Sequence, residues 1–356
     1  MDDWQPLCMA SQALRSCPSA DADLFVALCE RACVDLEGRE KASGAATLVN
    51  DGVVEVLCAW LSAARSNAGV QVAACRLIRR LVGQPYGADS PGRLRAARAG
   101  AVGAICGGMT QHVEHPGVQR AAASALLLLF RSPALAESSG AALDVLIAAM
   151  RVFSTDAGVN EACAGALRNL FMVQTHLASG VDGLDALVCA LRVHRADVHV
   201  VEHTCGALVN LCATDANAEA AVNAGVLEAL IPALQQHASS PGVSLAACLA
   251  LHNLVWKWHS AQRAACSAGA VPVLRSLLTT YEAKTKHGRA PKLAEADASL
   301  LRDAIMRVLH RIDPHSSHAR STDRAAAVAS HGWAKSSSAS TPRSPASGAN
   351  GHSGHR

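Results

Sequence analysis

Apolar residues recur along much of the chain with the period of an α-helix. The stretch Gly158–Phe171, GVNEACAGALRNLF, has small or apolar residues at positions i, i+3, i+4 and i+7. This spacing predicts a helix with a wide buried face. The same pattern returns in His199–Cys212 and in Gly242–Val255. No segment alternates in the manner of a β-strand over a useful length, so the pattern predicts an all-α fold.

Each of these three helices carries an asparagine just before its last leucine. The asparagines are Asn169, Asn210 and Asn253, and they are 41 and 43 residues apart. Regular spacing of this kind is the sequence signature of a repeat protein. The chain is therefore predicted to be a solenoid, in which stacked repeats share one continuous core.

A second marker divides the repeats, a glycine that follows Ala, Ser or Asp and precedes an apolar run. It occurs at Gly52, Gly100, Gly140, Gly180, Gly225 and Gly269, at intervals of 48, 40, 40, 45 and 44 residues. Glycine at this frequency predicts that a short helix ends in a left-handed residue and the next leaves at an angle. The helices expected after the glycines are Val53–Leu61, Val102–Met109, Leu143–Met150, Leu184–Leu191, Val226–Leu234 and Val271–Leu278. Each repeat thus reads as short helix, glycine corner, medium helix, turn and long helix.

The start of the chain departs from this rhythm. Its first 20 residues have little pattern and are expected to be frayed. Asp21 is a candidate N-cap for a helix that runs through Leu24, Leu28 and Val34. We therefore expect residues 1–37 to form an N-terminal segment with this one capping helix.

The repeat array is expected to occupy residues 38–312. Its last repeat is interrupted by Thr279–Ala298, a Lys-rich stretch with Gly and Pro, which predicts a long exposed loop before a final helix, Leu300–Ile312. Residues 313–356 are rich in Ser, His and Gly and have no period. Such a segment cannot bury enough apolar surface to offset its ordering cost, so it is predicted to be a disordered tail.

These phrases resemble a known family. AGALRNLF, and AGAVPVLRSLL at Ala268–Leu278, resemble armadillo repeats, whose units run three helices over about forty residues. Leu146–Phe153 and Leu187–His194 resemble the variety found in protist multi-repeat armadillo proteins and beside leucine-rich-repeat kinases. The resemblance covers residues 38–312 and implies an α–α superhelix, a right-handed solenoid of about six repeats. It is specific for fold and poor for function, because the family ranges from adhesion to nuclear transport.

The long helices suggest where a ligand binds. In an α-solenoid they line the concave face, and positions −7, −4, 0 and +3 from each asparagine share one stripe. Armadillo proteins that bind extended peptides use the asparagine to hydrogen-bond the peptide backbone, so the resemblance implies this role for Asn169, Asn210 and Asn253. The alternative is that each amide only ties its own helix to the next repeat.

Four further residues are candidates for this groove. His203 and Trp256 lie on the stripe, and Arg76 and Arg80 hold the equivalent positions of the first repeat. Trp256 fits either a groove wall or packing between repeats. Nuclear-import adaptors of the family carry a tryptophan one turn before each asparagine, which this chain replaces with Gly165, Gly206 and Leu249. Cargo import by that mechanism is therefore not expected, since the leading arginines would also repel a cationic peptide.

One motif points to an enzyme. His199-Val200-Val201-Glu202-His203 resembles the inverted zinc-peptidase motif, in which two histidines share a zinc ion and the glutamate acts as base. When Asn210 is aligned with Asn253, however, the two histidines fall on ordinary long-helix positions with no evident third ligand. We therefore expect no catalysis, no cofactor and no metal.

Charge is segregated along the chain. Seven arginines against one aspartate lie between Arg65 and Gly100, whereas Ser132–Trp256 holds eleven acidic residues against four arginines. The segregation could steer a charged partner or reflect drift on solvated helix faces, and both interpretations stay open. No aromatic residues are interleaved with the arginines for base stacking, so nucleic acid is not the favoured partner.

Cysteine usage bears on the compartment. The thirteen cysteines include no CxxC pair, and Cys29 with Cys33 gives only a weak two-ligand hint of metal. Cysteines in apolar helical stretches are expected to be buried free thiols, namely Cys75, Cys106, Cys163, Cys189, Cys212, Cys248 and Cys266. Free thiols predict a reducing compartment, the cytoplasm, with nuclear access left open. The first residues do not read as a secretory signal, and the longest apolar run, Ala121–Phe130, is too short to span a membrane.

The sequence as a whole predicts a protein–protein interaction scaffold that holds an extended peptide or a partner helix in its concave groove. The alternative is a structural assembly component that uses the convex face. The sequence predicts no membrane insertion and leaves the oligomeric state and the partner open.

Overall fold

The fold was taken from a computed structural model of the chain, which describes residues 5–37, 41–83, 90–137, 140–173, 183–286 and 295–313. The chain divides into two compact units, Met1–His315 and Ser316–Arg356, and every described residue lies in the first. The predicted tail, apart from Asp313, and Gly180 lie outside the described residues.

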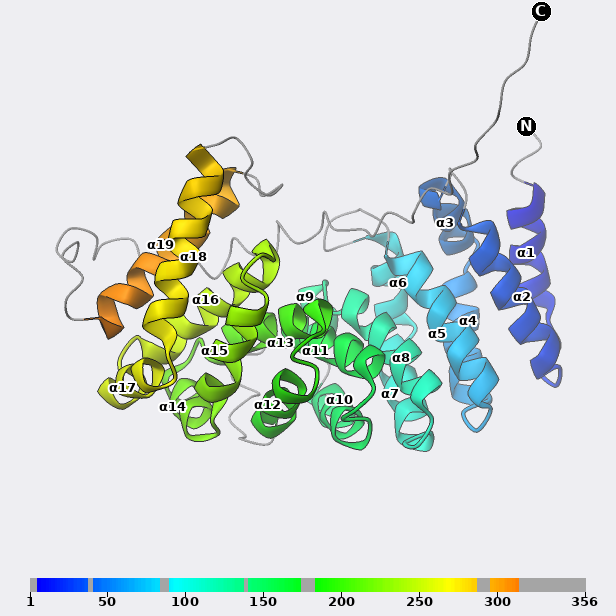
Figure 1. The fold of residues 1–356 in the computed structure, drawn as a ribbon. Coiled ribbons are helices and arrows are strands. Elements are labelled where there is room, and N and C mark those ends of the chain that lie inside the picture. Colours follow the sequence, from blue (N-terminus) through cyan, green and yellow to red (C-terminus); the bar gives the residue numbers. More distant parts are fainter. Residues whose placement is uncertain are drawn as a thin grey trace, which may run out of the picture. The chain divides into compact units, whose positions relative to one another are not determined.

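The described residues form nineteen α-helices and no strand, so the prediction of an all-α fold is confirmed (Figure 1). Two rows of helices run through the array. The first row comprises α2 (Ala22–Asp35), α5 (Ala68–Val82), α8 (Pro116–Leu129), α11 (Ala157–Val173), α13 (Val198–Leu211), α16 (Pro241–Val255) and α19 (Glu295–Ile312). The second row comprises α4 (Val53–Ala63), α7 (Ala101–Gln111), α10 (Gly140–Val152), α12 (Leu184–Val193), α15 (Val226–Gln236) and α18 (Ala270–Lys286).

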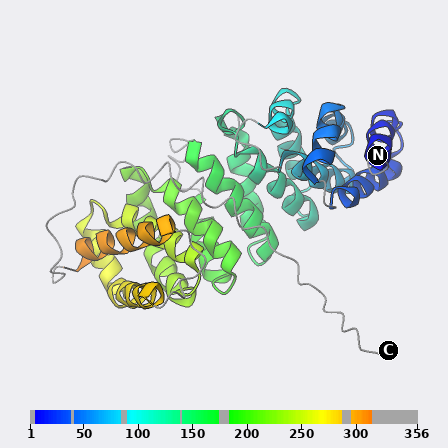
Figure 2. The ribbon, with the colours of Figure 1, turned by 90° about the horizontal axis from the view of Figure 1, so that it is seen from above.

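Shorter helices connect one repeat to the next. They are α3 (Lys41–Asn50), α6 (Pro91–Arg98), α9 (Pro133–Glu137), α14 (Asp215–Asn223) and α17 (His259–Ser267), and α1 (Gln5–Ser16) precedes the first row. Each first-row helix packs on the next one, from α2 with α5 to α16 with α19, and the second row does the same from α4 with α7 to α15 with α18. Figure 2 shows the array from above, with its colours running in chain order from blue to orange. Contacts therefore run between neighbouring repeats, as in a solenoid.

Glycine corners set the angle between most connecting helices and the second row. Gly52, Gly100, Gly225 and Gly269 have φ values of 83°, 68°, 78° and 85°. This left-handed region favours glycine, as the sequence predicted. The prediction was wrong for Gly140, whose φ is not left-handed. Gly140 is the first residue of α10, so this glycine begins a helix instead of ending one.

A second set of glycines lets neighbouring first-row helices approach closely. These glycines stand at the second position of α5, α8, α11 and α16. A Cβ atom added at Gly158 would lie 2.6 Å from Nε of Arg120 in α8, and one at Gly242 would lie 2.5 Å from Oε2 of Glu202 in α13. A side chain from the preceding helix therefore occupies the space above each of these two glycines.

The N-terminal segment and the last repeat differ from their predictions. Asp21 caps α2, since its side chain accepts from Leu24 N at 3.0 Å. The segment nevertheless holds two helices where one was expected, because α1 buries Leu14 completely and packs on α2, α3 and α4. In the last repeat, α18 continues to Lys286 and α19 begins at Glu295, so much of the expected loop Thr279–Ala298 is helical.

The core between the rows is built mainly from Ala, Leu and Val, as the low aromatic content suggested. Five of the seven cysteines expected in the core are buried, but Cys189 is half-buried and Cys266 is exposed. Burial raises the pKa of the Cys75 thiol to about 12, so this thiol is protonated near neutral pH. All thirteen cysteines are free and lie within the described residues.

No single helix in the described ranges is long and apolar enough to cross a membrane. A bent pair of segments, Ser43–Asn50 and Val53–Ala63, meets that requirement only when the two are taken together.

Candidate functional site

The three asparagines occupy equivalent places on the first row. Asn169 lies in α11, Asn210 in α13 and Asn253 in α16. In each case Nδ2 donates a hydrogen bond to a backbone carbonyl of the preceding first-row helix. The acceptors are Leu127 O at 2.8 Å, Arg168 O at 2.8 Å and Val209 O at 2.9 Å, respectively. The amides therefore tie α8 to α11, α11 to α13 and α13 to α16.

These carbonyls belong to the residue directly before the asparagine position of each repeat. Leu127 and Val209 fall within the last turn of α8 and α13, where helix carbonyls lack a partner inside the helix. The asparagine of the next repeat satisfies that acceptor, which would otherwise cost free energy if buried. The tie that was considered as the alternative to ligand binding is thus present in all three repeats.

The hydrogen bond to the preceding helix leaves other hydrogen-bonding groups of each amide available. A carboxamide has two N–H donors and an acceptor oxygen, so one bond through Nδ2 leaves the second N–H and Oδ1 for another group. Asn169 is 9% exposed, whereas Asn210 and Asn253 are half-buried. His252 Nδ1 lies 3.4 Å from Oδ1 of Asn253. The bond to the preceding helix fixes the orientation of each amide, which favours a second bond to a ligand.

The arginines near the asparagine position of the first repeat lie in different surroundings. Arg80 forms an ion pair with Glu37 after α2, and Arg76 is exposed. Burial, together with the charge of Arg80, lowers the pKa of Arg79, while Glu161 of α11 opposes that shift. Arg79 therefore lies within electrostatic reach of a first-row helix two repeats away. Sequence reasoning selected Arg76 and Arg80 and missed Arg79.

A second arginine that the sequence reasoning missed lies between two asparagines. Burial is the main cause that lowers the pKa of Arg168 to about 10, with Glu202 opposing and Arg131 reinforcing the shift. At neutral pH its guanidinium stays charged. The signal available in the sequence is a basic residue directly before the asparagine position, and it recurs in four first-row helices: Arg79, Arg168, His252 and Arg307.

His203 is placed against the neighbouring helix. A Cβ atom on Gly165 would lie 3.4 Å from its Nδ1, so the imidazole packs over the backbone of α11. Nδ1 is buried without a hydrogen-bond partner. Burial, followed by the charges of Arg168 and His199, lowers the pKa of His203 to about 4. The side chain is therefore neutral at physiological pH.

The residues of the zinc-like motif are directed to different neighbours. Glu202 lies against Gly242 of α16, and His203 packs on Gly165 of α11. Within the ranges that the structure describes, no three His, Cys, Asp or Glu side chains are grouped so that they could hold a metal ion.

Trp256 is covered by the last helix of the first row. The guanidinium carbon of Arg311 in α19 lies 4.2 Å from the centre of the indole ring, and the centre of the His252 ring lies 5.0 Å from it. An arginine over an indole face is a favourable cation–π arrangement. Trp256 therefore packs α16 against α19, and only part of its surface is open.

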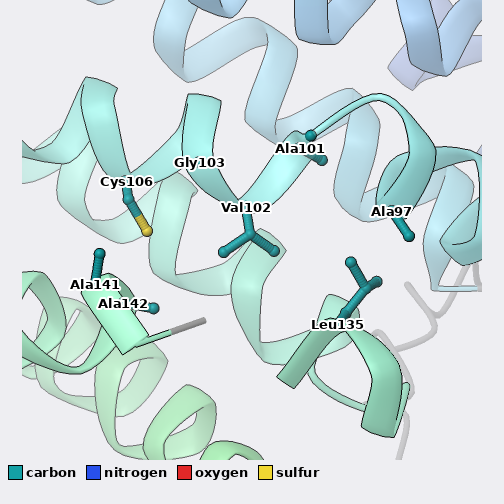
Figure 3. Close-up of a pocket in the computed structure, with 9 residues that line it drawn as sticks. Ala97, Ala101, Val102, Gly103, Cys106, Leu135, Ala141 and Ala142 are labelled. Atoms are coloured by element: carbon teal, nitrogen blue, oxygen red, sulfur yellow. The ribbon is translucent and has the colours of Figure 1, made fainter. Parts of the chain in front are cut away.

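A pocket of about 240 Å³ lies elsewhere, beside the connecting helices of the second and third repeats (Figure 3). It has small, uncharged walls from α6, α7, α9 and α10, which include Ala97, Gly100, Val102, Cys106, Leu135 and Ala142. None of the residues predicted for the groove lines it.

Solved structures with a similar architecture were found by comparison. An engineered protein matches with 24% identity and a TM-score of 0.65, over 86% of this chain and 68% of that chain. A chain from a study of a phosphorylation switch in the interaction between cadherin and β-catenin matches with 16% identity and a TM-score of 0.65, over 87% of this chain and 69% of that chain. The chain has an armadillo-repeat fold.

A designed armadillo repeat protein also matches, with 17% identity and a TM-score of 0.44, over 86% of this chain and 100% of that chain. No family model matches the sequence, and no match was found among curated proteins. At these identities the comparisons establish the armadillo solenoid, as the sequence resemblance predicted, and leave the ligand to be argued from the residues.

Proposed function

We propose that this armadillo solenoid is a protein-interaction scaffold that holds an extended, acidic peptide along its first row. The proposal rests on three side-chain amides at equivalent positions, those of Asn169, Asn210 and Asn253, which we call the asparagine ladder. Each amide is fixed by a hydrogen bond to the preceding helix. Equivalent amides at successive repeats suit a ligand that presents equivalent groups at regular steps. A polypeptide backbone is such a ligand.

The amides favour an extended peptide over a partner helix. In a helix the backbone N–H and C=O groups already bond to one another, so a row of amides would find few free partners along its side. An extended strand leaves those groups open on both edges. The second N–H and Oδ1 of each asparagine can then pair with a peptide C=O and N–H.

Charge on the first row favours an acidic ligand. Arg79 and Arg168 stand one position before the asparagine position, and Arg76 and Arg131 extend the positive charge toward the N-terminal repeats. A guanidinium binds a carboxylate with matched geometry, and of the two arginines directly before the asparagine position Arg168 is half-buried and Arg79 is exposed. Glu161 and Glu202 offset part of this charge, so the arginines select acidic residues at particular positions rather than along the whole peptide.

A solved relative in fold is consistent with a binding role. The matched chain from the cadherin and β-catenin study belongs to work on an interaction between two proteins. Binding through the first row, a cytoplasmic location and the absence of catalysis are proposals for the present chain. A structural component that uses the opposite face is the competing function, and it does not need the first-row amides.

The test is the affinity of a fluorescein-labelled peptide of alternating Glu and Thr, measured by anisotropy at low salt. The proposal predicts binding that weakens as salt rises, and no comparable binding of the peptide with Lys in place of Glu. Replacing Asn169, Asn210 and Asn253 together with Ala removes up to three hydrogen bonds of about 1 kcal/mol each, so affinity should fall at least about tenfold.

Two further variants separate binding from folding. Asn223→Ala changes an exposed asparagine of α14, away from the ladder, and should bind like the wild type. Ala213→Trp leaves all three ties in place but adds bulk to an exposed position on the predicted stripe, and it should also weaken binding. Unchanged affinity in both the triple variant and Ala213→Trp would contradict the proposal and favour the opposite face.

A further inference from the structure

The two end helices of the first row each pack against one other first-row helix. Among the described helices, every first-row helix between them packs against two others, whereas α2 meets only α5 and α19 meets only α16 within the row, and α1 also packs on α2. One more first-row helix would stack on the flank of α2 that faces away from α5, which we call its outer flank. In solenoids such terminal flanks are normally polar, because an apolar one would associate with other molecules.

The outer flank of α2 carries apolar side chains on both sides of Arg31. Leu24, Ala27, Arg31 and Val34 are spaced by three, four and three residues, which puts them on one stripe of the helix. Leu24 is 41% exposed and Val34 is 61% exposed. We call Leu24, Ala27, Arg31 and Val34 the end surface. Met9 on α1 is also exposed, at 68%.

The other end of the row is different. On α19 the exposed positions include Arg302, Asp303 and His310. Among the described residues, seven large hydrophobic side chains are conspicuously exposed, and three of these, Met9, Leu24 and Val34, lie on α1 and α2. The remaining four are spread over α6, α10, α12 and the turn after α7. The concentration at one end marks a contact surface rather than scattered apolar residues.

The spacing of the end surface is that of a coiled-coil seam. Positions 24, 27, 31 and 34 follow the a and d places of a heptad, and a second helix can pack its own apolar stripe against them. Asp23, Glu30 and Glu37 then fall on one flank of the seam, and Asp35, paired with Arg31 at 3.0 Å, falls on the other. One flank therefore carries three carboxylates, of which Glu37 also pairs with Arg80, and the other carries Asp35.

These charges argue against a second copy of the chain. Two parallel copies of α2 would bring Glu30 of one toward Asp35 of the other, and two antiparallel copies would bring the rows of Asp23 and Glu30 together. Like charges beside a helix seam destabilise the pairing in either orientation. Lys or Arg beside the seam of a partner helix would instead pair with these carboxylates.

We propose that the end surface docks an amphipathic helix of a partner protein, with an apolar stripe flanked by Lys or Arg. This helix would continue the first row beyond α2. The site is separate from the asparagine ladder and does not depend on the peptide proposed above. Apolar burial supplies affinity, and the basic flanks supply orientation and selectivity.

The probe is a designed amphipathic helical peptide with Leu at its a and d positions and Lys at its flanking e and g positions. A matched peptide carries Glu in place of each Lys. With the full chain, anisotropy should show binding of the Lys peptide at least about tenfold tighter than of the Glu peptide. The variant Leu24→Glu with Val34→Glu should lose this binding, and since both side chains are exposed the fold should persist.

Two controls make the result specific. Val193→Glu changes an exposed valine of α12, 50% exposed, and should leave binding of the Lys peptide unchanged. Asp23→Lys with Glu30→Lys should shift the preference toward the Glu peptide. Equal binding of the Lys peptide to the wild type and to Leu24→Glu with Val34→Glu would overturn the proposal. So would sedimentation showing a dimer of the wild type that the same double variant abolishes, because the occupant would then be a second copy.

Discussion

At the scale of single residues, burial rather than residue type sets the chemistry of the first row. His203 belongs to a residue type that often titrates near neutral pH, yet its ring lies over Gly165 and its Nδ1 has no partner. Arg168, whose charge helps to lower the pKa of His203, keeps that charge although burial lowers its own pKa to about 10. His203 therefore contributes a neutral surface, and Arg168 contributes a positive charge.

His203 makes a prediction about acid stability. Its folded pKa of about 4 lies below the ordinary value of 6.5, so the fold favours the neutral form. The stability this gives is complete above pH 6.5 and is lost as pH falls toward 4. Between pH 7 and pH 5 the loss should be roughly 2 kcal/mol, from linkage with these two pKa values.

Urea unfolding at the two pH values, for the wild type and His203→Gln, measures this term. The variant should lose less stability on acidification than the wild type, by about the stated amount. The same acid sensitivity in both proteins would show that other groups are responsible.

At the scale of elements, side-chain amides reinforce each repeat from within. Gln71 Nε2 donates to Leu61 O at 3.0 Å and Ala64 O at 3.1 Å, and Gln119 Nε2 donates to Met109 O and His112 O, both at 2.8 Å. In the third repeat Asn160 makes one corresponding bond, to Phe153 O at 2.8 Å, and a second to Asp156 O, directly before its own helix. Each amide joins a first-row helix to the end of the second-row helix before it.

Gln119→Leu tests how much these side-chain hydrogen bonds contribute to the free energy of unfolding. Gln119 is 2% exposed, so the apolar replacement would leave Met109 O without the bond that Gln119 donates, whereas His112 O would keep its bond from His115 N at 3.0 Å. The loss at Met109 costs about 1–3 kcal/mol, and chemical denaturation should show a decrease of stability in that range. Gln111→Leu, at the exposed end of α7, is the matched control and should change stability by less than about 0.5 kcal/mol. Equal effects of the two substitutions would refute the assignment.

At the scale of the whole molecule, the periodic features were predictable and the exceptions were not. The helical period and the spacing of Gly52, Gly100 and Gly225 indicated six repeats, because each repeat packs its helices with similar residues at equivalent positions. The prediction for Gly140 was wrong because this glycine is the first residue of α10 and does not end a helix. The helix α1 was missed although its buried residues Ala10, Ser11 and Leu14 share one helix face, because its sequence does not repeat the motif of the array.

The candidate site was predictable in outline only. The asparagine ladder was visible as a repeat, but its bonds to Leu127 O, Arg168 O and Val209 O depend on how one helix is set against the next. Arg79 and Arg168 were missed because the reasoning followed the asparagine stripe itself. A side chain one position earlier points about 100° away on an ideal helix, and only the packing shows that both arginines still reach charges on neighbouring first-row helices.

The most direct test of the central claim is a crystal structure of the chain with the Glu–Thr peptide bound. The account predicts an extended peptide along the first row, with backbone atoms about 3 Å from the side-chain amides of Asn169, Asn210 and Asn253 and with Glu carboxylates at Arg79 or Arg168. A peptide bound to the second row or the connecting helices, with those three amides making only their ties to the preceding helices, would contradict it.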